Sequence, residues 1–286
     1  MTTATQHLHD RIAVVFDFDL TLAPGTFDAL LQRCEQEPDK WKADLVAPLQ
    51  RKGWEEILAK VFGLVQLAGE NDVSITRDLM AQVGHDLRLF DGVPDLFGEL
   101  RHVAQQVRPG VELEFYIVSS GLRDIIAHTT IATEFKAIWA TQLHFTDDGT
   151  VSFPKLIVTH PEKVRYILAL CKGLDPAGPN APSEVYRDLP DEQWHVPLDQ
   201  VVYVGDGTSD MGVFRFLNSR GGIALAVYKG KDSEEWQSAE RVAPDRRVEN
   251  LAPSEYGADG ELMRSLGLAV RSIAHRVALR ALAQGQ

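Results

Sequence analysis

Cysteine is scarce in this sequence, and the cysteine patterns of metal sites are missing from it. The 286 residues include two cysteines, Cys34 and Cys171, which lie far apart and without the spacing of a metal site. No cluster of histidine and cysteine indicates zinc. A disulfide between the two cysteines stays open, but two reduced thiols of a cytosolic protein are the favoured interpretation.

Long hydrophobic runs are also missing. Residues 1–10 are polar and lack the apolar segment of a signal peptide, and no apolar run approaches the length of a membrane span. We therefore expect a cytoplasmic location and no membrane partner.

Positive charge is in short supply relative to negative charge. The chain has 29 lysine and arginine residues against 41 aspartate and glutamate residues, which gives a formal net charge of -12. Because a nucleic-acid surface needs clustered basic side chains, we expect no nucleic-acid partner. A small phosphorylated substrate is compatible with this composition, since it needs only a local positive pocket.

Apolar strands alternate with helical patterns over most of the chain. The strands are predicted near 12–17, 111–119, 137–141, 201–205 and 222–227. The helices are predicted at about 93–107, 122–135, 161–171, 211–217 and 260–283. Such alternation is typical of a parallel sheet covered by helices on both faces, so we expect a three-layer α/β fold.

Residues 24–88 differ from the rest, because apolar residues recur there at helical spacing and no strand-like alternation occurs. This pattern predicts roughly four helices in an inserted helical domain, with the α/β core formed by residues 1–23 and 89–286. Downstream, the aspartates and glycine at 147–149 predict a β-hairpin. The proline-rich segment 173–197 predicts a long surface loop.

Acidic residues follow two of the predicted strands at the points where these strands end. The first strand leads into Asp17 and Asp19, and the strand at 201–205 leads into Asp206 and Asp210. In a parallel sheet, ligands bind beyond the carboxyl ends of the strands. Buried carboxylates are costly unless a cation compensates them, and oxygen ligands are those that Mg²⁺ prefers. The sequence therefore predicts an enzyme with a Mg²⁺ site held by these acids.

The spacing of Asp17 and Asp19 suits phosphoryl transfer. This reaction needs a nucleophile in line with phosphorus, a cation on the phosphoryl oxygens and a proton for the leaving group. On an extended chain, two carboxyls placed two residues apart would face one side. The first can attack phosphorus, while the second protonates the departing oxygen and later deprotonates water, which requires different protonation states in the two groups.

Small polar residues supply further groups for a phosphate. Thr21 and Ser119 offer hydroxyls to phosphoryl oxygens. Ser120 and Gly121 offer backbone amides at a predicted helix start, where anions bind well. These four residues are predicted to bind the substrate.

The positive charge that a dianionic phosphate needs is assigned to Lys163. Lys155 is the alternative. It follows Pro154 at the end of a hairpin strand, whereas Lys163 begins a helix, which favours Lys163.

These groups occur in the order of the four motifs of the haloacid dehalogenase superfamily, and the chain resembles its phosphohydrolases. The first motif, D-x-D-x-T, matches residues 17–21, and the fourth, G-D-x-x-x-D, matches residues 205–210. The second motif matches Ser119 and the third matches Lys163. The resemblance covers residues 12 to about 227, and the run around Ser119 with the hairpin after it is similar to phosphoserine-phosphatase-like members.

The resemblance implies a Rossmann-like core and a cap domain at residues 24–88 that closes over the site. It implies Asp17 as nucleophile and Asp19 as general acid and base. It also implies that Mg²⁺ is held by Asp17, Asp206 and the backbone carbonyl of Asp19, with Asp210 in support. Because dehalogenases generally lack the second acid, the expected reaction is Mg²⁺-dependent hydrolysis of a small phosphorylated metabolite through an aspartyl phosphate.

Two alternatives stay open on the same core. One is a phosphonatase or a phosphotransferase, of which the phosphonatase would need a cap lysine that forms a Schiff base. The other is a phosphate-binding regulatory module without turnover, against which the presence of all four acids argues. The sequence predicts neither the substrate nor the oligomeric state.

Overall fold

The computed structural model describes residues 9–69, 73–176, 184–207, 209–228 and 248–283. The chain divides into two compact units. The first unit contains residues 1–16, 90–116 and 160–286, and the second contains residues 17–89 and 117–159. The predicted helical segment 24–88 thus belongs to a unit that also includes the chain from residue 117 to residue 159.

The strands form a sheet of seven in the order β4-β3-β2-β1-β5-β6-β7. They are β1 (Arg11–Phe16), β2 (Glu112–Leu122), β3 (Ala137–Phe145), β4 (Val151–Leu156), β5 (Val201–Gly205), β6 (Ile223–Tyr228) and β7 (Asn250–Pro253). Strands β1, β5, β6 and β7 pair in parallel, and β3 and β4 form an antiparallel hairpin. The predicted α/β class is confirmed, while β7 was not predicted.

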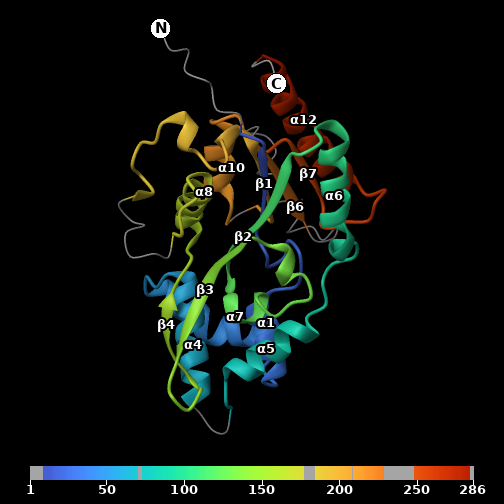
Figure 1. Ribbon diagram of the computed structural model, residues 1–286. Helices are drawn as coiled ribbons and strands as arrows, with labels where there is room; N and C mark the ends of the chain where they lie inside the picture. Colours follow the sequence, from blue (N-terminus) through green and yellow to red (C-terminus); the bar gives the residue numbers. More distant parts are fainter. Residues whose placement is uncertain (1–8, 70–72, 177–183, 208, 229–247, 284–286) are drawn as a thin grey trace. The chain divides into compact units, whose positions relative to one another are not determined.

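Helices cover both faces of the sheet in the first unit (Figure 1). Helices α6 (Val93–Val107) and α12 (Glu261–Ala283) pack against each other on one face. Helices α8 (Lys163–Cys171) and α10 (Met211–Asn218) pack against each other on the opposite face. This arrangement gives the three layers that the alternating pattern predicted.

The apolar stripe of α12 accounts for its place on the sheet. Its buried residues recur every three or four positions and include Leu262, Leu266, Val270, Ile273 and Val277. This spacing places them on one side of a helix, and burial of each large aliphatic side chain contributes roughly 1.5–3 kcal/mol. The predicted helix at 260–283 is confirmed by α12.

The second unit is built from short helices and the β3–β4 hairpin (Figure 1). The helical elements are α1 (Thr26–Arg33), α2 (Pro38–Trp41), the π-helical turn η1 (Lys42–Val46), α3 (Ala47–Arg51), α4 (Glu56–Gly69), α5 (Arg77–Asp86) and α7 (Arg123–Ile126). Leu30 of α1, Leu64 of α4 and Phe145 of β3 belong to one hydrophobic core. The helical segment and the hairpin therefore stabilise each other.

The predicted helix at 122–135 is wrong. Strand β2 continues to Leu122, and α7 ends after four residues at Ile126. Both the amide and the hydroxyl of Thr129 donate to the carbonyl of Ile126, at 3.2 and 2.8 Å. This side-chain bond competes with helical pairing and ends α7 after a single turn.

Two loop predictions have different outcomes. The hairpin turn is confirmed: Gly149 has a φ of 86°, a conformation that glycine adopts without strain. In the predicted loop 173–197, residues 177–183 lie outside the described residues. The described remainder includes a 3₁₀ turn at Asp191–Gln193.

Two expectations about the whole chain can be compared with the described residues. Cys34 and Cys171 are free thiols, as favoured from their spacing. No helix within the described ranges has the length and apolar character needed to cross a membrane.

Candidate active site

The carboxyl ends of β1 and β5 lie next to each other. The parallel register pairs Phe16 with Val204. Asp17 is bonded directly to Phe16, and Asp206 follows Gly205, so both acids emerge from the same edge of the sheet. One carboxylate oxygen from each of Asp17, Asp206 and Asp210 lies within 4.8 Å of the others. The fold thus brings together three of the four acids predicted to hold a metal.

Asp210 is the N-cap residue directly before α10 and is completely buried in the first unit. Its Oδ1 atom accepts hydrogen bonds from the Lys163 ammonium at 2.7 Å and from the Tyr203 hydroxyl at 2.6 Å. A Cβ atom on Gly205 would come within 2.1 Å of the Asp210 Oδ2 atom, so glycine is required beside this carboxylate. The two donors fix one oxygen of Asp210 and leave the other for a different partner.

Lys163 is also completely buried. Besides its ion pair with Asp210, its ammonium donates to the Ser209 hydroxyl at 3.3 Å, and that hydroxyl donates to Asp206 at 3.3 Å. A buried lysine is tolerated only when it is paired in this way. Lys155, the alternative, is exposed on β4 of the second unit.

The donor set of the acidic cluster fits Mg²⁺. Carboxylate oxygens are its preferred protein ligands, and none of the three clustered residues is histidine or cysteine. Among the described residues, the buried Oδ2 atom of Asp210 has no hydrogen-bond partner. An orphaned carboxylate oxygen of this kind is what a bound cation would compensate.

Asp19 lies in the second unit and is held by Thr26. Its Oδ1 atom accepts from the Thr26 amide at 3.0 Å, and its Oδ2 atom accepts from the Thr26 hydroxyl at 3.0 Å. Desolvation raises the pKa of Asp19 to about 7, and the nearby charge of Asp17 contributes to this increase. The bonds from Thr26 and the charge of Lys60 act in the opposite direction. Asp19 is therefore able to carry a proton near neutral pH.

The chain turns sharply just after Asp19. Leu20 adopts a left-handed φ of 61°, and its amide donates to the carbonyl of Ala23 at 2.8 Å. The amides of Thr21 and Leu22 both donate to the carbonyl of Phe18, at 3.2 and 2.9 Å. Thr21 is fully buried at this turn. The turn separates the acidic pair from α1 and fixes where Thr21 lies.

The Ser119–Gly121 segment forms the end of β2 rather than a helix start, which corrects the sequence prediction. The amide of Gly121 donates to the Ser119 hydroxyl at 3.1 Å. Within the described part of the chain, the buried Ser120 hydroxyl has no hydrogen-bond partner. A Cβ atom on Gly121 would come within 2.7 Å of the Asp19 Oδ1 atom, so glycine permits the close approach of β2 to Asp19.

Two contacts of the site were not predicted. Tyr203 lies inside the apolar strand β5, and a buried tyrosine hydroxyl usually needs a hydrogen-bond partner. A tyrosine within an apolar run could therefore have indicated a polar contact at this position. Thr26 is the first residue of α1, where threonine alone suggests only an ordinary helix start.

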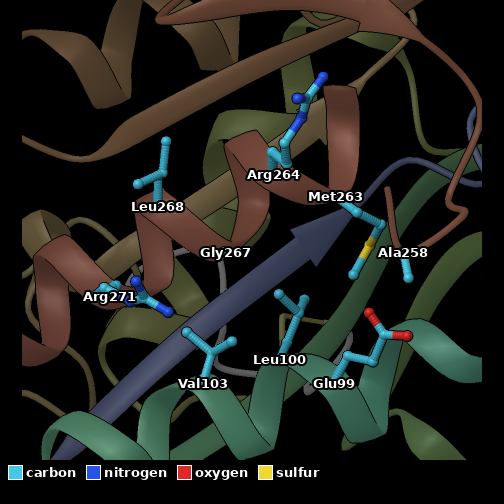
Figure 2. A pocket seen from close by; sticks show the side chains of 9 residues that line it. All are labelled: Glu99, Leu100, Val103, Ala258, Met263, Arg264, Gly267, Leu268 and Arg271. Atoms are coloured by element: carbon cyan, nitrogen blue, oxygen red, sulfur yellow. The ribbon is translucent and has the colours of Figure 1, made fainter. Parts of the chain in front are cut away.

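A separate cavity of about 380 Å³ lies between α6 and α12 in the first unit (Figure 2). Apolar residues Leu100 and Met263 line it together with the charged residues Glu99, Arg264 and Arg271. It contains none of the residues predicted to form the site.

The fold is similar to that of several solved structures. A probable phosphoserine phosphatase from Vibrio cholerae has a TM-score of 0.57 at 14% identity, covering 95% of this chain and 68% of that chain. A phospho-aspartyl intermediate analogue of phosphoserine phosphatase has a TM-score of 0.53 at 13% identity, covering 90% and 98%. A hydrolase from Salmonella enterica serovar Typhi has a TM-score of 0.54 at 12% identity, covering 80% and 65%. Because the identities are only 12–14%, these similarities show a shared fold and nothing further.

The sequence is similar to one curated protein and matches one family model. An uncharacterized protein of Borreliella burgdorferi is 25% identical over 273 residues, which cover 86% of this chain and 91% of that protein. The family model of haloacid dehalogenase-like hydrolases matches residues 14–215, from β1 into α10. Since this match spans more than half of the chain and both acidic strand ends, the chain belongs to the haloacid dehalogenase-like hydrolases.

Proposed function

We propose that this protein is a Mg²⁺-dependent phosphatase that hydrolyses a small phosphorylated metabolite through an aspartyl phosphate. The observation that carries the proposal is the pair of carboxyls Asp17 and Asp19: Asp17 belongs to the acidic cluster, and Asp19 is held by two hydrogen bonds from Thr26, with its pKa raised to about 7. A phosphatase needs such a proton donor for its leaving group. The similar fold of the phosphoserine phosphatases supports the same activity.

In the first step, a carboxylate oxygen of Asp17 attacks phosphorus and the bond from phosphorus to the ester oxygen breaks. The electron pair of that bond goes to the ester oxygen, which takes the proton of Asp19. Asp19 is thereby left as a carboxylate, and the alcohol departs.

In the second step, the Asp19 carboxylate takes a proton from water, and the resulting hydroxide oxygen attacks phosphorus. The bond between phosphorus and Asp17 breaks, which releases inorganic phosphate and restores both acids. The same side chain thus acts first as an acid and then as a base, which requires a pKa near the working pH.

Binding of the phosphate is assigned to four small polar residues and one lysine. Thr21, Ser119, Ser120 and Gly121 would donate to phosphoryl oxygens, and the orphaned hydroxyl of Ser120 is suited to that role. Lys163 would add a positive charge that Asp210 and Ser209 already orient. Asp17, Asp206, Asp210 and the Asp19 carbonyl would hold Mg²⁺, which neutralises phosphoryl charge when bound.

The helical segment 24–88 is proposed as the cap that selects the substrate. Gly25 stands at its start, and Gly92, which follows it, has a left-handed φ of 84°. Such positions can absorb backbone rotation during closure. The segment would exclude water while Asp17 attacks.

The proposed function is tested with an aryl phosphate and a panel of phosphorylated metabolites, with and without Mg²⁺. Wild-type protein should hydrolyse the aryl ester only with Mg²⁺, and Asp17→Asn should abolish turnover while the protein stays folded. Asp39→Asn is the matched control, since that side chain is exposed and should leave activity unchanged. Near-wild-type activity of the Asp17 variant would remove the covalent mechanism.

A further inference from the structure

Thr26 joins two segments of the proposed site within the second unit. It is fully buried as the first residue of α1, immediately after the turn that contains Thr21. Its amide and hydroxyl both donate to Asp19, and its hydroxyl also accepts from the amide of Leu122 at 2.9 Å. Leu122 is the last residue of β2, directly after the Ser119–Gly121 segment. One threonine therefore connects the acid to the end of this strand.

The contact with Leu122 determines which way the Thr26 hydroxyl points. A hydroxyl has one proton to donate and can accept through its lone pairs. The Leu122 amide can only donate, so it takes an acceptor position of the hydroxyl. The single hydroxyl proton is then directed at the Oδ2 atom of Asp19.

Both oxygens of Asp19 are therefore held from one side. The amide of Thr26 contacts Oδ1 and the hydroxyl contacts Oδ2, each at 3.0 Å. Two parallel bonds to the two oxygens fix the plane of a carboxyl, whereas one bond would leave it free to rotate. Gly121 of β2 lies against the same pair, because a Cβ atom there would come within 2.7 Å of both the Asp19 Oδ1 atom and the Thr26 hydroxyl oxygen.

We propose that Thr26 is a positioning residue that fixes the orientation of the Asp19 carboxyl, so that the proton of this carboxyl faces the leaving oxygen of the substrate. This inference rests on the proposed function, in which Asp19 is the proton donor. Thr26 does not touch the substrate. It acts through Asp19, and its hydroxyl, rather than its shape, carries the effect.

The kinetic test compares Thr26→Val with Thr26→Ser on two esters. Valine keeps the branched shape and the amide but removes the hydroxyl, while serine keeps the hydroxyl. Thr26→Val should lower kcat for alkyl phosphates by about 10- to 100-fold, because a misoriented Asp19 no longer protonates the leaving oxygen efficiently. The same variant should lower kcat for an activated aryl phosphate by less than about 3-fold, since a phenolate scarcely needs the proton. KM should change little, and serine should restore most of the alkyl ester activity.

The matched control is Thr129→Val. Thr129 is a buried threonine of the same unit, and its hydroxyl donates to the carbonyl of Ile126 at 2.8 Å. Its loss should affect stability without changing the ratio of alkyl to aryl activity. Equal losses on both esters in Thr26→Val, or no loss on either, would overturn the positioning role. If Thr26→Val does not fold, Thr26→Ala replaces it in the same comparison.

A second measurement does not depend on turnover. Thermal unfolding of the wild type, Thr26→Val, Asp19→Ala and the double variant forms a double-mutant cycle. Non-additive shifts in melting temperature are expected, because the two side chains are in direct contact. Additive shifts would overturn the proposal. If the wild-type protein hydrolysed neither ester, the proposed function would fail, and the cycle alone would decide whether Thr26 fixes Asp19.

Discussion

Asp19 and Asp210 are both proposed to serve the same reaction, yet the two units surround them with different chemistry. In the second unit, Asp19 is desolvated and lies near the charge of Asp17, and these two effects outweigh the bonds from the neutral amide and hydroxyl of Thr26. In the first unit, Asp210 is paired with the Lys163 ammonium and bonded by the Tyr203 hydroxyl. The first environment favours a carboxyl that holds a proton, and the second compensates a buried charge. The difference shows how one residue type can take two roles in one proposed reaction.

The largest loss of stability is expected when Asp210 loses its ion-pair partner, Lys163. Lys163→Met keeps the apolar stem but leaves Asp210 as a buried, unpaired carboxylate. Removal of one member of such a pair should lower the free energy of unfolding by about 3–5 kcal/mol. Urea denaturation followed by circular dichroism measures this change.

The control for this prediction is Lys155→Met. That lysine is exposed on β4, so its replacement should change stability by less than about 0.5 kcal/mol. A small loss in Lys163→Met, comparable with that of the control, would show that the ion pair is not buried in solution.

The second effect concerns the stability that the Asp19 proton contributes, which depends on pH. The pKa of Asp19 is raised from 3.8 to about 7, so the folded metal-free protein holds this proton more tightly than the unfolded chain does. The corresponding stability is fully present below about pH 4 and is lost as the pH rises toward 7. In the absence of metal, the wild type should therefore lose stability relative to Asp19→Asn between about pH 4 and pH 7. Parallel stability curves for the two proteins would contradict the raised pKa.

The smallest effect is expected when Asp210 loses its neutral donor but keeps Lys163. Tyr203→Phe keeps the ring, which packs edge-on against Phe214 with ring centroids 6.0 Å apart. Loss of a hydrogen bond to a charged group should cost about 1.5–3 kcal/mol in the free energy of unfolding. Thermal unfolding measures the change, which should be smaller than that of Lys163→Met.

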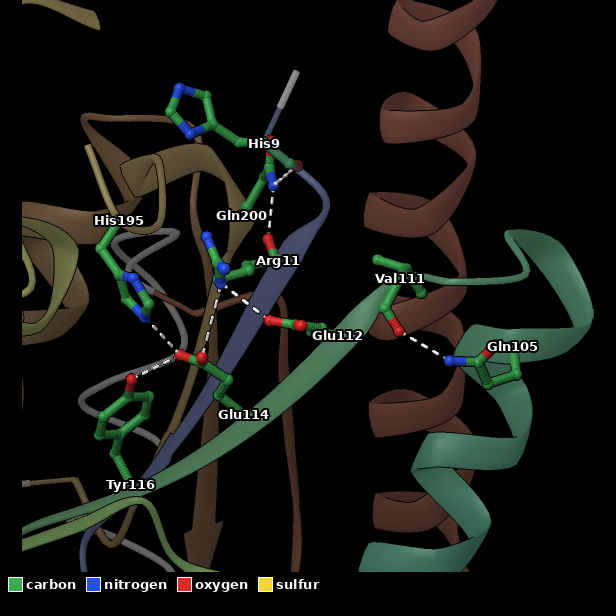
Figure 3. A network of polar contacts seen from close by, with 9 residues as sticks. All are labelled: His9, Arg11, Gln105, Val111, Glu112, Glu114, Tyr116, His195 and Gln200. Atoms are coloured by element: carbon green, nitrogen blue, oxygen red, sulfur yellow. Dashed lines mark hydrogen bonds and ion pairs between the residues drawn. The ribbon is translucent and has the colours of Figure 1, made fainter. Parts of the chain in front are cut away.

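Tyr116→Phe provides the matched control for Tyr203→Phe. The Tyr116 hydroxyl donates to Glu114 at 2.5 Å, and His195 contacts the same carboxylate at 2.8 Å (Figure 3). Both variants remove a buried tyrosine hydroxyl from a carboxylate, but only Asp210 belongs to the proposed site. We expect activity to fall in Tyr203→Phe alone. Equal activity in the two variants would show that the bond from Tyr203 to Asp210 does not matter for the proposed reaction.

Much of the sheet followed from local patterns in the sequence. Apolar runs placed β1 and β5, and the abrupt change from apolar to acidic residues placed Asp17 and Asp206 at their ends. These features depend on neighbours along the chain, so they can be read from it directly. The helix predicted after Gly121 failed, because the Thr129 side chain competes for the Ile126 carbonyl in a way that apolar spacing does not reveal.

The sequence by itself determined the α/β class, the order of the motifs and the acidic residues at the strand ends, because each depends on short-range periodicity and on residue type. Only the tertiary structure decided the partners of these acids. The Leu122 amide reaches the hydroxyl of Thr26 across 96 positions, and Lys163 reaches Asp210 across 47. Such contacts follow from how the strands and helices pack, and they give two chemically identical carboxyls different environments.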